Sequence, residues 1–377
     1  MNDLGVSLHA HNYVATFRDA VALRSEPPEF DLRYLKPGFS PWHRASPIVG
    51  IERTTPRVAK SLMGLLTDCA PYAGTLDQYA HHAKRALMAH LVHYWDASRP
   101  TLFLHSNGYD SRILSSCLAE LRDGGFNLGR VHFRCHEPEG DQFKRIMERQ
   151  GWPRDAYSVF EFPAEDLFDV GHWDEPGTSP WLPLTTFANF WSDIVPRSEE
   201  KNWNLLAGQA GGEAFEYPTL QKPPFVPYQF CENKPVQLWW SYFIDGTDWI
   251  GDMEARFGKV LMPYLGTRHI LTVSMLHPDF LGYEDNGCDR VRASILRTFK
   301  DSTLDLPRVL RTYEWRVSEK RWSEMRDRYA ASKFLRDVPG APSADELIAR
   351  MRATWFSQTD NTAERLWRFA SLWEVIA

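Results

Sequence analysis

The sequence has few cysteines, and their spacing fits neither a metal site nor a disulfide framework. Its 377 residues include five cysteines, and no two of them form a Cys-x-x-Cys pair. This scatter argues against a zinc ribbon and against a small disulfide-stapled fold. We therefore expect reduced, buried thiols at Cys69, Cys117, Cys135, Cys231 and Cys288.

Long apolar runs are also missing. Nothing in the chain approaches an uncharged apolar stretch long enough to span a bilayer, so we expect no membrane partner. The first twenty residues lack a basic region followed by an apolar one, which is the pattern of a secretory signal. The expected location is the cytoplasm.

An excess of basic residues is absent too. The formal net charge is −6, so the global field does not attract nucleic acid, and we do not expect it as a partner. A basic stretch between Arg308 and Arg328 is balanced by Glu314, Glu319, Glu324 and Asp327. This balance favours a solvated helix face over a polyanion site.

What the sequence does contain is enough apolar material for a large core. Hydrophobic residues make up 43% and charged residues 24% of the chain. This composition is typical of a globular enzyme, and the length allows one large domain plus a smaller unit.

Residues 102–121 are the most informative segment, because they predict a buried strand, a polar turn and an amphipathic helix in direct succession. Residues 102–104 are a short apolar run without helical period, as in a strand buried on both faces of a parallel sheet. Apolar residues then recur at helical spacing. They are Ile113, Leu114, Cys117, Leu118 and Leu121.

The turn between strand and helix has the chemistry of a phosphate site. Ser106, Asn107, Gly108 and Ser111 are small or turn-tolerant, so backbone N–H groups can point into one concavity at the positive end of the helix. Asp110 is an anion and would repel phosphate directly. A Mg²⁺ ion held by Asp110 could bridge to the phosphates, which makes this residue the leading metal-ligand candidate.

This turn resembles the Ser-Gly-Gly-x-Asp-Ser pyrophosphate loop of the N-type ATP pyrophosphatases, with Asn107 in place of a usual glycine. Its surroundings resemble the synthetase domain of asparagine synthetase and β-lactam synthetase. The ordered matches cover roughly residues 70 to 310. They are a helix over 76–95, a strand over 131–135, an acidic helix start at 139–141, residues 204–207 running into a second loop at 208–215, the segment 262–266 and a helix at 295–297.

The resemblance implies an α/β fold, a doubly wound, mostly parallel sheet of the adenine nucleotide alpha hydrolase-like (HUP) type, with a helical C-terminal part. It places the synthetase domain at 71–377, after an N-terminal β-containing remnant at 1–70. In that remnant, residues 34–39 and 48–52 are predicted to be two strands of a hairpin. An active glutaminase of this family needs an N-terminal cysteine, and no cysteine precedes Cys69. We therefore expect no glutamine-derived ammonia from this chain.

The resemblance also implies a set of site residues for ATP and Mg²⁺. The nucleotide-binding set is Leu104, His105, Ser106, Asn107, Gly108, Asp110, Ser111, Arg134 and Gly208, and the metal ligands are Asp110 and Glu213. In the second loop a catalytic glutamate of the family falls at Gln209, and its magnesium-binding aspartate falls at Gly212. The pyrophosphate-binding lysine falls near Ala293, where Arg290 or Arg292 is expected to replace it, because guanidinium grips phosphate bidentately.

The function implied is that of an ATP-dependent, AMP-forming carbon–nitrogen ligase. A substrate carboxylate, on a small molecule or peptide, attacks the α-phosphorus, and an amine then displaces AMP from the acyl-adenylate. The amine is free ammonia, an amine of the substrate, or a product delivered by a separate partner protein. Two alternatives stay open. One is adenylation of a base or nucleoside carbonyl, and the other is a binding or scaffold protein that kept the fold and lost the chemistry.

Overall fold

The computed structural model describes two compact units, which we treat separately. Residues 56–161 and 190–312 belong to the first unit, together with 1–11, and residues 12–55, 162–189 and 313–377 belong to the second. The described residues are 27–36, 48–49, 69–137, 139–160, 191, 193–208, 211–212, 215, 253, 256–308, 318–354 and 362–377.

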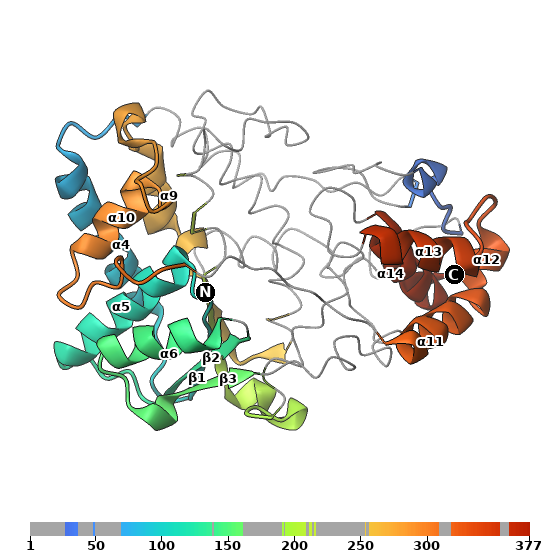
Figure 1. Cartoon of the computed structure of the whole chain (residues 1–377), viewed down its shortest axis with the longest axis horizontal. Coiled ribbons are helices and arrows are strands. Elements are labelled where there is room, and N and C mark those ends of the chain that lie inside the picture. Colours follow the sequence, from blue (N-terminus) through green and yellow to red (C-terminus); the bar gives the residue numbers. More distant parts are fainter. Residues whose placement is uncertain are drawn as a thin grey trace. The chain divides into compact units, whose positions relative to one another are not determined.

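The first unit is built on a five-stranded sheet in which every pairing is parallel (Figure 1). The strand order is β3-β2-β1-β4-β5. The bounds are Thr101–Leu104 for β1, Val131–His136 for β2, Tyr157–Phe160 for β3, Asn204–Ala207 for β4 and Lys259–Leu261 for β5. This sheet agrees with a doubly wound α/β fold, and it confirms the strands predicted at 102–104 and 131–135. Residues 204–207, predicted only as the approach to the second loop, form β4.

The strand order creates a switch point beside β1. Thr101 is in register with Val131 of β2 on one side and with Asn204 of β4 on the other. The chain therefore runs outward from β1 to β3 and later returns to continue the sheet from the opposite edge of β1. In open parallel sheets, ligands bind beyond the carboxyl ends of the strands at such a point.

The helices of this unit pack around one another beside the sheet, with α4, α5 and α10 in mutual contact (Figure 1). Thr75 and Gln78 form a capping box that starts α4, which confirms the helix predicted from residue 76. The α-helices are α4 (Leu76–Tyr94), α5 (Tyr109–Asp123), α6 (Gly140–Arg149), α9 (Thr267–Ser274) and α10 (Arg290–Arg297). The 3-10 helices are η2 (Arg154–Ala156), η5 (Arg197–Asn202), η6 (Pro263–Leu265) and η7 (Pro278–Phe280).

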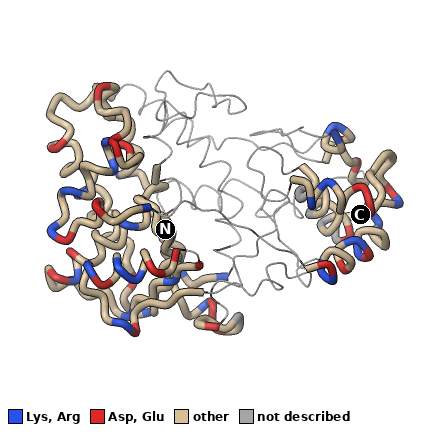
Figure 2. Tube along the Cα trace, in the orientation of Figure 1, with Lys and Arg blue, Asp and Glu red and all other residues tan. Residues whose placement is uncertain are grey.

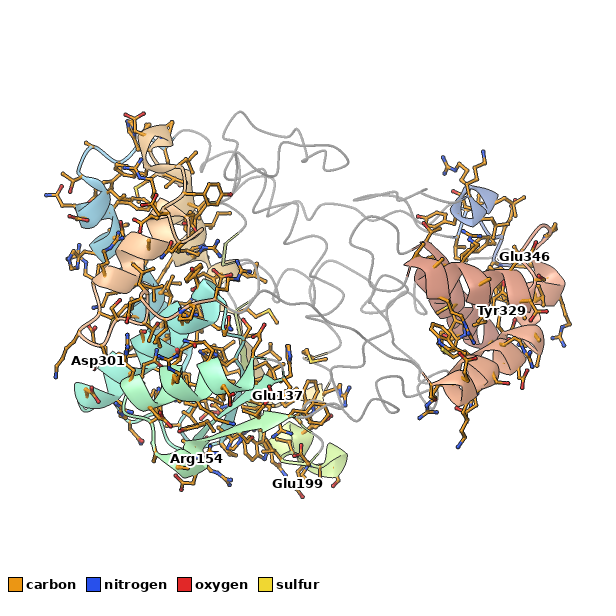
Figure 3. All side chains as sticks on the ribbon, in the orientation of Figure 1. Glu137, Arg154, Glu199, Asp301, Tyr329 and Glu346 are labelled. Carbon is orange, nitrogen blue, oxygen red and sulfur yellow. The ribbon has the colours of Figure 1, made fainter. Side chains whose placement is uncertain are left out.

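The second unit is helical and has an aromatic core. Tyr329 lies among the side chains of its helices (Figure 3) and is fully buried. The Phe30 ring packs edge-on against Phe334 at 4.9 Å between ring centroids. The helices are η1 (Leu32–Leu35), α11 (Glu319–Ala330), α12 (Lys333–Asp337), α13 (Ala344–Thr354) and α14 (Thr362–Ile376).

The hairpin predicted in the N-terminal part is wrong at its first strand. Tyr34 and Leu35 belong to the 3-10 helix η1, because the Asp31 side chain caps it by accepting from the Arg33 backbone N–H at 3.0 Å. Burial of the Tyr34 ring in the core of the second unit also favours this turn. An antiparallel bridge does occur, but it joins Phe30 to Ile48. Residues 37–39 and 50–52 lie outside the described residues, and the boundary predicted near residue 70 stays a prediction.

Basic and acidic residues are interspersed along the described trace of each unit (Figure 2). Within the described ranges, no helix combines the length and apolarity needed to cross a bilayer. The four described cysteines are free thiols, of which Cys117, Cys135 and Cys288 are buried and Cys69 is half-buried.

Candidate functional site

The first loop of the site leaves β1 at Leu104 and enters α5 at Tyr109. Its small residues hold one another in place. The Ser111 hydroxyl accepts from the Ser106 backbone N–H at 3.2 Å and lies 3.1 Å from the Ser106 hydroxyl oxygen. The Gly108 N–H donates to that same Ser106 oxygen at 3.2 Å. The loop is thus a compact turn at the N-terminus of a 15-residue helix, where an anion is favoured.

A buried carboxylate braces this loop from the next strand–helix unit. Glu139, which precedes α6 and is 1% exposed, accepts from the Asn107 backbone N–H at 2.6 Å. That N–H is therefore committed to the protein and not to a phosphate. The sequence predicted residue 139 only as the acidic start of a helix, since nothing local signals a contact 32 residues away.

The Asn107 side chain lies buried beside this contact. It is 1% exposed, and within the described part of the chain neither its amide nitrogen nor its amide oxygen has a hydrogen-bond partner. Buried polar atoms without partners are rare in proteins. A water or a ligand group next to the loop would supply both the missing acceptor and the missing donor.

Arg112 ties the loop to the segment that follows α10. Its guanidinium is fully buried and donates to the Asn107 carbonyl at 2.8 Å. The same guanidinium donates to the carbonyls of Thr303, Leu306 and Pro307 at 2.7 to 2.9 Å. Burial lowers the pKa of Arg112 to about 10, so the side chain stays charged at neutral pH. The sequence did not assign this residue to the site.

The second loop lies directly against the first. A Cβ atom on Gly208 would lie 3.5 Å from the Ser111 hydroxyl oxygen, which is an ordinary contact. On Gly211 it would lie 2.7 Å from both Cβ and Cγ of Asp110. The Tyr264 hydroxyl completes the contact by donating to the Asp110 carbonyl at 2.9 Å. Gln209 and Glu213 lie outside the described residues, so their predicted roles stay predictions.

Of the two candidate arginines, the structure brings Arg292 to the loops. Its Nη1 atom lies 2.9 Å from Oδ1 of Asp110. Arg290 is exposed, and its Nη1 donates to the Asp279 carbonyl at 3.1 Å. Arg292 directly precedes Ala293 and Arg290 lies three residues before it, and both belong to the first turn of α10. The two arginines differ in the direction of their side chains.

The carboxylate of Asp110, a predicted magnesium ligand, pairs with a guanidinium in this structure. The cation beside Asp110 is already the Arg292 guanidinium, and Gly212 offers no side-chain oxygen. Across the described residues, no group of three or more His, Cys, Asp or Glu could hold a metal ion. Glu213, the other predicted ligand, lies outside the described residues, so the Mg²⁺ site predicted at Asp110 and Glu213 stays a prediction.

Positive charge gathers around Tyr109, the first residue of α5. The guanidinium carbons of Arg112, Arg292 and Arg308 lie 5.2, 5.8 and 5.9 Å from the centroid of its ring. Arg308 is exposed. Three guanidinium groups therefore lie near this ring, and the carboxylates of Asp110 and Asp289 pair with that of Arg292.

His105 and Arg134 have structural partners beside the loop. His105 is buried, and its Nε2 lies 3.1 Å from the Ser115 hydroxyl. Burial lowers the pKa of His105 to about 3, so this imidazole is neutral. The Arg134 guanidinium pairs with both Asp193 carboxylate oxygens at 2.8 Å and points toward β3, where it donates to Ser158. The backbone of Arg134 also contacts the loop, since its carbonyl accepts from the His105 N–H at 2.8 Å.

Comparison with known proteins finds no match, either among family models or among curated proteins. The resemblance to asparagine synthetase and β-lactam synthetase therefore remains a prediction from the residues themselves.

Proposed function

We propose that this chain is an ATP-dependent amide-forming ligase with a synthetase domain of the HUP type. It would bind ATP at the loops that follow β1 and β4 and activate a substrate carboxylate. In the first step a carboxylate oxygen bonds to the α-phosphorus and pyrophosphate leaves. In the second step an amine or ammonia nitrogen bonds to the acyl carbon, AMP leaves, and the nitrogen loses a proton.

The observation that carries this proposal is the contact between the two loops at the switch point of the sheet. Gly208 lies within ordinary contact distance of Ser111, and Gly211 approaches Asp110 so closely that a Cβ atom there would clash with it. Such a junction, at the carboxyl ends of β1 and β4 and the N-terminus of α5, is where α/β proteins bind nucleotide phosphates.

The described residues also suit a triphosphate chemically. The Ser106 and Ser111 hydroxyls and the N-terminus of α5 supply neutral donors. The unpartnered Asn107 amide adds a donor and an acceptor beside the loop. These groups would hold the β- and γ-phosphates while the α-phosphorus stays open to attack.

A second candidate function is nucleotide binding without chemistry. The ion pair between Asp110 and Arg292 favours it, because the pair engages the carboxylate predicted to hold a magnesium ion that would activate the phosphates in a metal-dependent ligase. Adenylation of a base followed by sulfur attack gains no support from Cys117, which is fully buried and whose pKa is raised by that burial.

Product analysis distinguishes these functions. The purified chain is incubated with ATP, a panel of carboxylates and a panel of amines, and nucleotides and pyrophosphate are quantified with and without the carboxylate. We expect AMP and pyrophosphate in equal amounts, formed only when one of the carboxylates is present. ATP binding without any turnover would support the second candidate, and release of ADP and phosphate would contradict the ligase.

A further inference from the structure

Arg308 directly follows a backbone segment that is tied to the first loop. The Arg112 guanidinium donates to the Asn107 carbonyl of the loop at 2.8 Å. The same guanidinium donates to the Leu306 and Pro307 carbonyls at 2.7 and 2.9 Å. The Pro307 ring also fixes one backbone dihedral angle of this segment. The backbone of Arg308 is therefore held beside the loop, while its side chain is exposed.

The Arg308 side chain lies near the start of α5. Its guanidinium carbon is 5.9 Å from the centroid of the Tyr109 ring, and Tyr109 is the first residue of this helix. The attraction between a cation and an aromatic ring holds a guanidinium without using its N–H groups for a carboxylate or a carbonyl. These N–H groups therefore lie close to a helix N-terminus, where an anion is favoured.

The other two guanidinium groups near this ring are already engaged. Arg292 pairs with two carboxylates, and Arg112 donates to four backbone carbonyls. Burial lowers the pKa of Arg112, the charge of Arg308 lowers it further, and the carboxylate of Glu139 acts in the opposite direction. Within the described part of the chain, Arg308 has neither an ion-pair partner nor a hydrogen-bond partner for its guanidinium. Its donors are therefore available to a ligand.

We propose that Arg308 binds the pyrophosphate part of the nucleoside triphosphate at the first loop. This inference rests on the proposed function and assigns a binding residue to the leaving group of its first step. A guanidinium presents N–H donors in a planar fork that matches two phosphate oxygens, and it stabilises the charge that grows on pyrophosphate as the bond to the α-phosphorus breaks. The buried, unpartnered Asn107 amide of the same loop independently indicates a ligand or a water there.

The test is a calorimetric titration of the full chain and of Arg308→Met with ATP, inorganic pyrophosphate and AMP. The variant should bind ATP and pyrophosphate about tenfold more weakly, the effect of one lost hydrogen bond to a charged group, and AMP with unchanged affinity. Unchanged affinity for ATP, or an equal loss for ATP and AMP, would overturn the inference while leaving the nucleotide site intact. No binding of ATP to the unaltered chain would overturn the proposed function, and the inference with it.

Arg130→Met is the matched control. Arg130 is also exposed, and its guanidinium carbon lies 5.3 Å from the centroid of the Trp203 ring. Both residues directly precede strands, β2 and β4, so this pair lies at the edge of the sheet opposite the loops. Its loss should leave the affinity for ATP unchanged, and equal effects of the two substitutions would contradict the assignment. The urea midpoint of both variants should match that of the unaltered chain, because both side chains are exposed. A large drop in Arg308→Met would indicate a structural role and contradict the proposal.

Discussion

Replacement of Arg112 by methionine is expected to reduce the free energy of unfolding of the first unit by about 4 kcal/mol, because the acceptors of a fully buried guanidinium lose charge-assisted hydrogen bonds. Four carbonyls share this guanidinium, and three of them belong to the buried residues Asn107, Thr303 and Leu306. Methionine can fill part of the volume of the arginine side chain, but it offers these carbonyls no hydrogen-bond donor. ATP binding should also be lost, because the hydrogen bond from Arg112 to the Asn107 carbonyl holds the first loop in place.

Urea denaturation followed by tryptophan fluorescence measures the first effect, and calorimetry with ATP measures the second. The matched control is Arg122→Met on the same helix. Arg122 also donates to two carbonyls, those of Gln150 and Gly151, but its side chain is 29% exposed. We expect a loss of about 1 kcal/mol there, because water replaces the donor. Equal losses in the two variants would show that the burial of Arg112 has no special importance.

The second large effect is expected at the contact between the loops. Gly211→Ala places a methyl group 2.7 Å from Cβ and Cγ of Asp110 and from Cε2 of Tyr264. Two of these three atoms are close to the backbone of the first loop and cannot move far. The loops should separate, and the affinity for ATP should fall by at least about tenfold, which corresponds to roughly 1.4 kcal/mol.

Gly208→Ala is the matched control for this variant. The added methyl group would meet Ser111 and Asp110 at 3.5 to 3.8 Å, so no neighbour has to shift. Both substitutions keep the backbone N–H, so a difference between them reports the fit of the loops and not the loss of a donor. Calorimetric titration with ATP measures both variants. Unchanged affinity in Gly211→Ala would show that phosphate binding does not depend on this contact.

The parts of the fold that the sequence predicted are those with a strong local pattern. β1 contains a continuous apolar run, β2 alternates apolar and polar residues, and α4 begins with a capping box. β3 and β5 were not predicted, because four and three residues of mixed polarity carry no period. These two strands are defined by pairing with β2 and β4.

The residues of the candidate site also divide into those with a local sequence signal and those without one. The small residues of the first loop and the glycines of the second could be recognised locally. The contact of Arg292 with Asp110 spans 182 residues, and the sequence left Arg290 and Arg292 as equal candidates. Asp289 accounts for the difference between them, because it caps the helix at Arg292 and holds the Arg292 guanidinium toward Asp110. Long-range contacts of this kind depend on how the strands are ordered, which no single segment encodes.

The central claim, that the loops after β1 and β4 bind the triphosphate of ATP, is tested most directly by comparing ATP with AMP in calorimetric titrations of the unaltered chain. The two ligands share the base, the ribose and the α-phosphate. If the loops hold the β- and γ-phosphates, ATP should bind at least about tenfold more tightly than AMP. Equal affinities, or no heat with ATP, would contradict the claim.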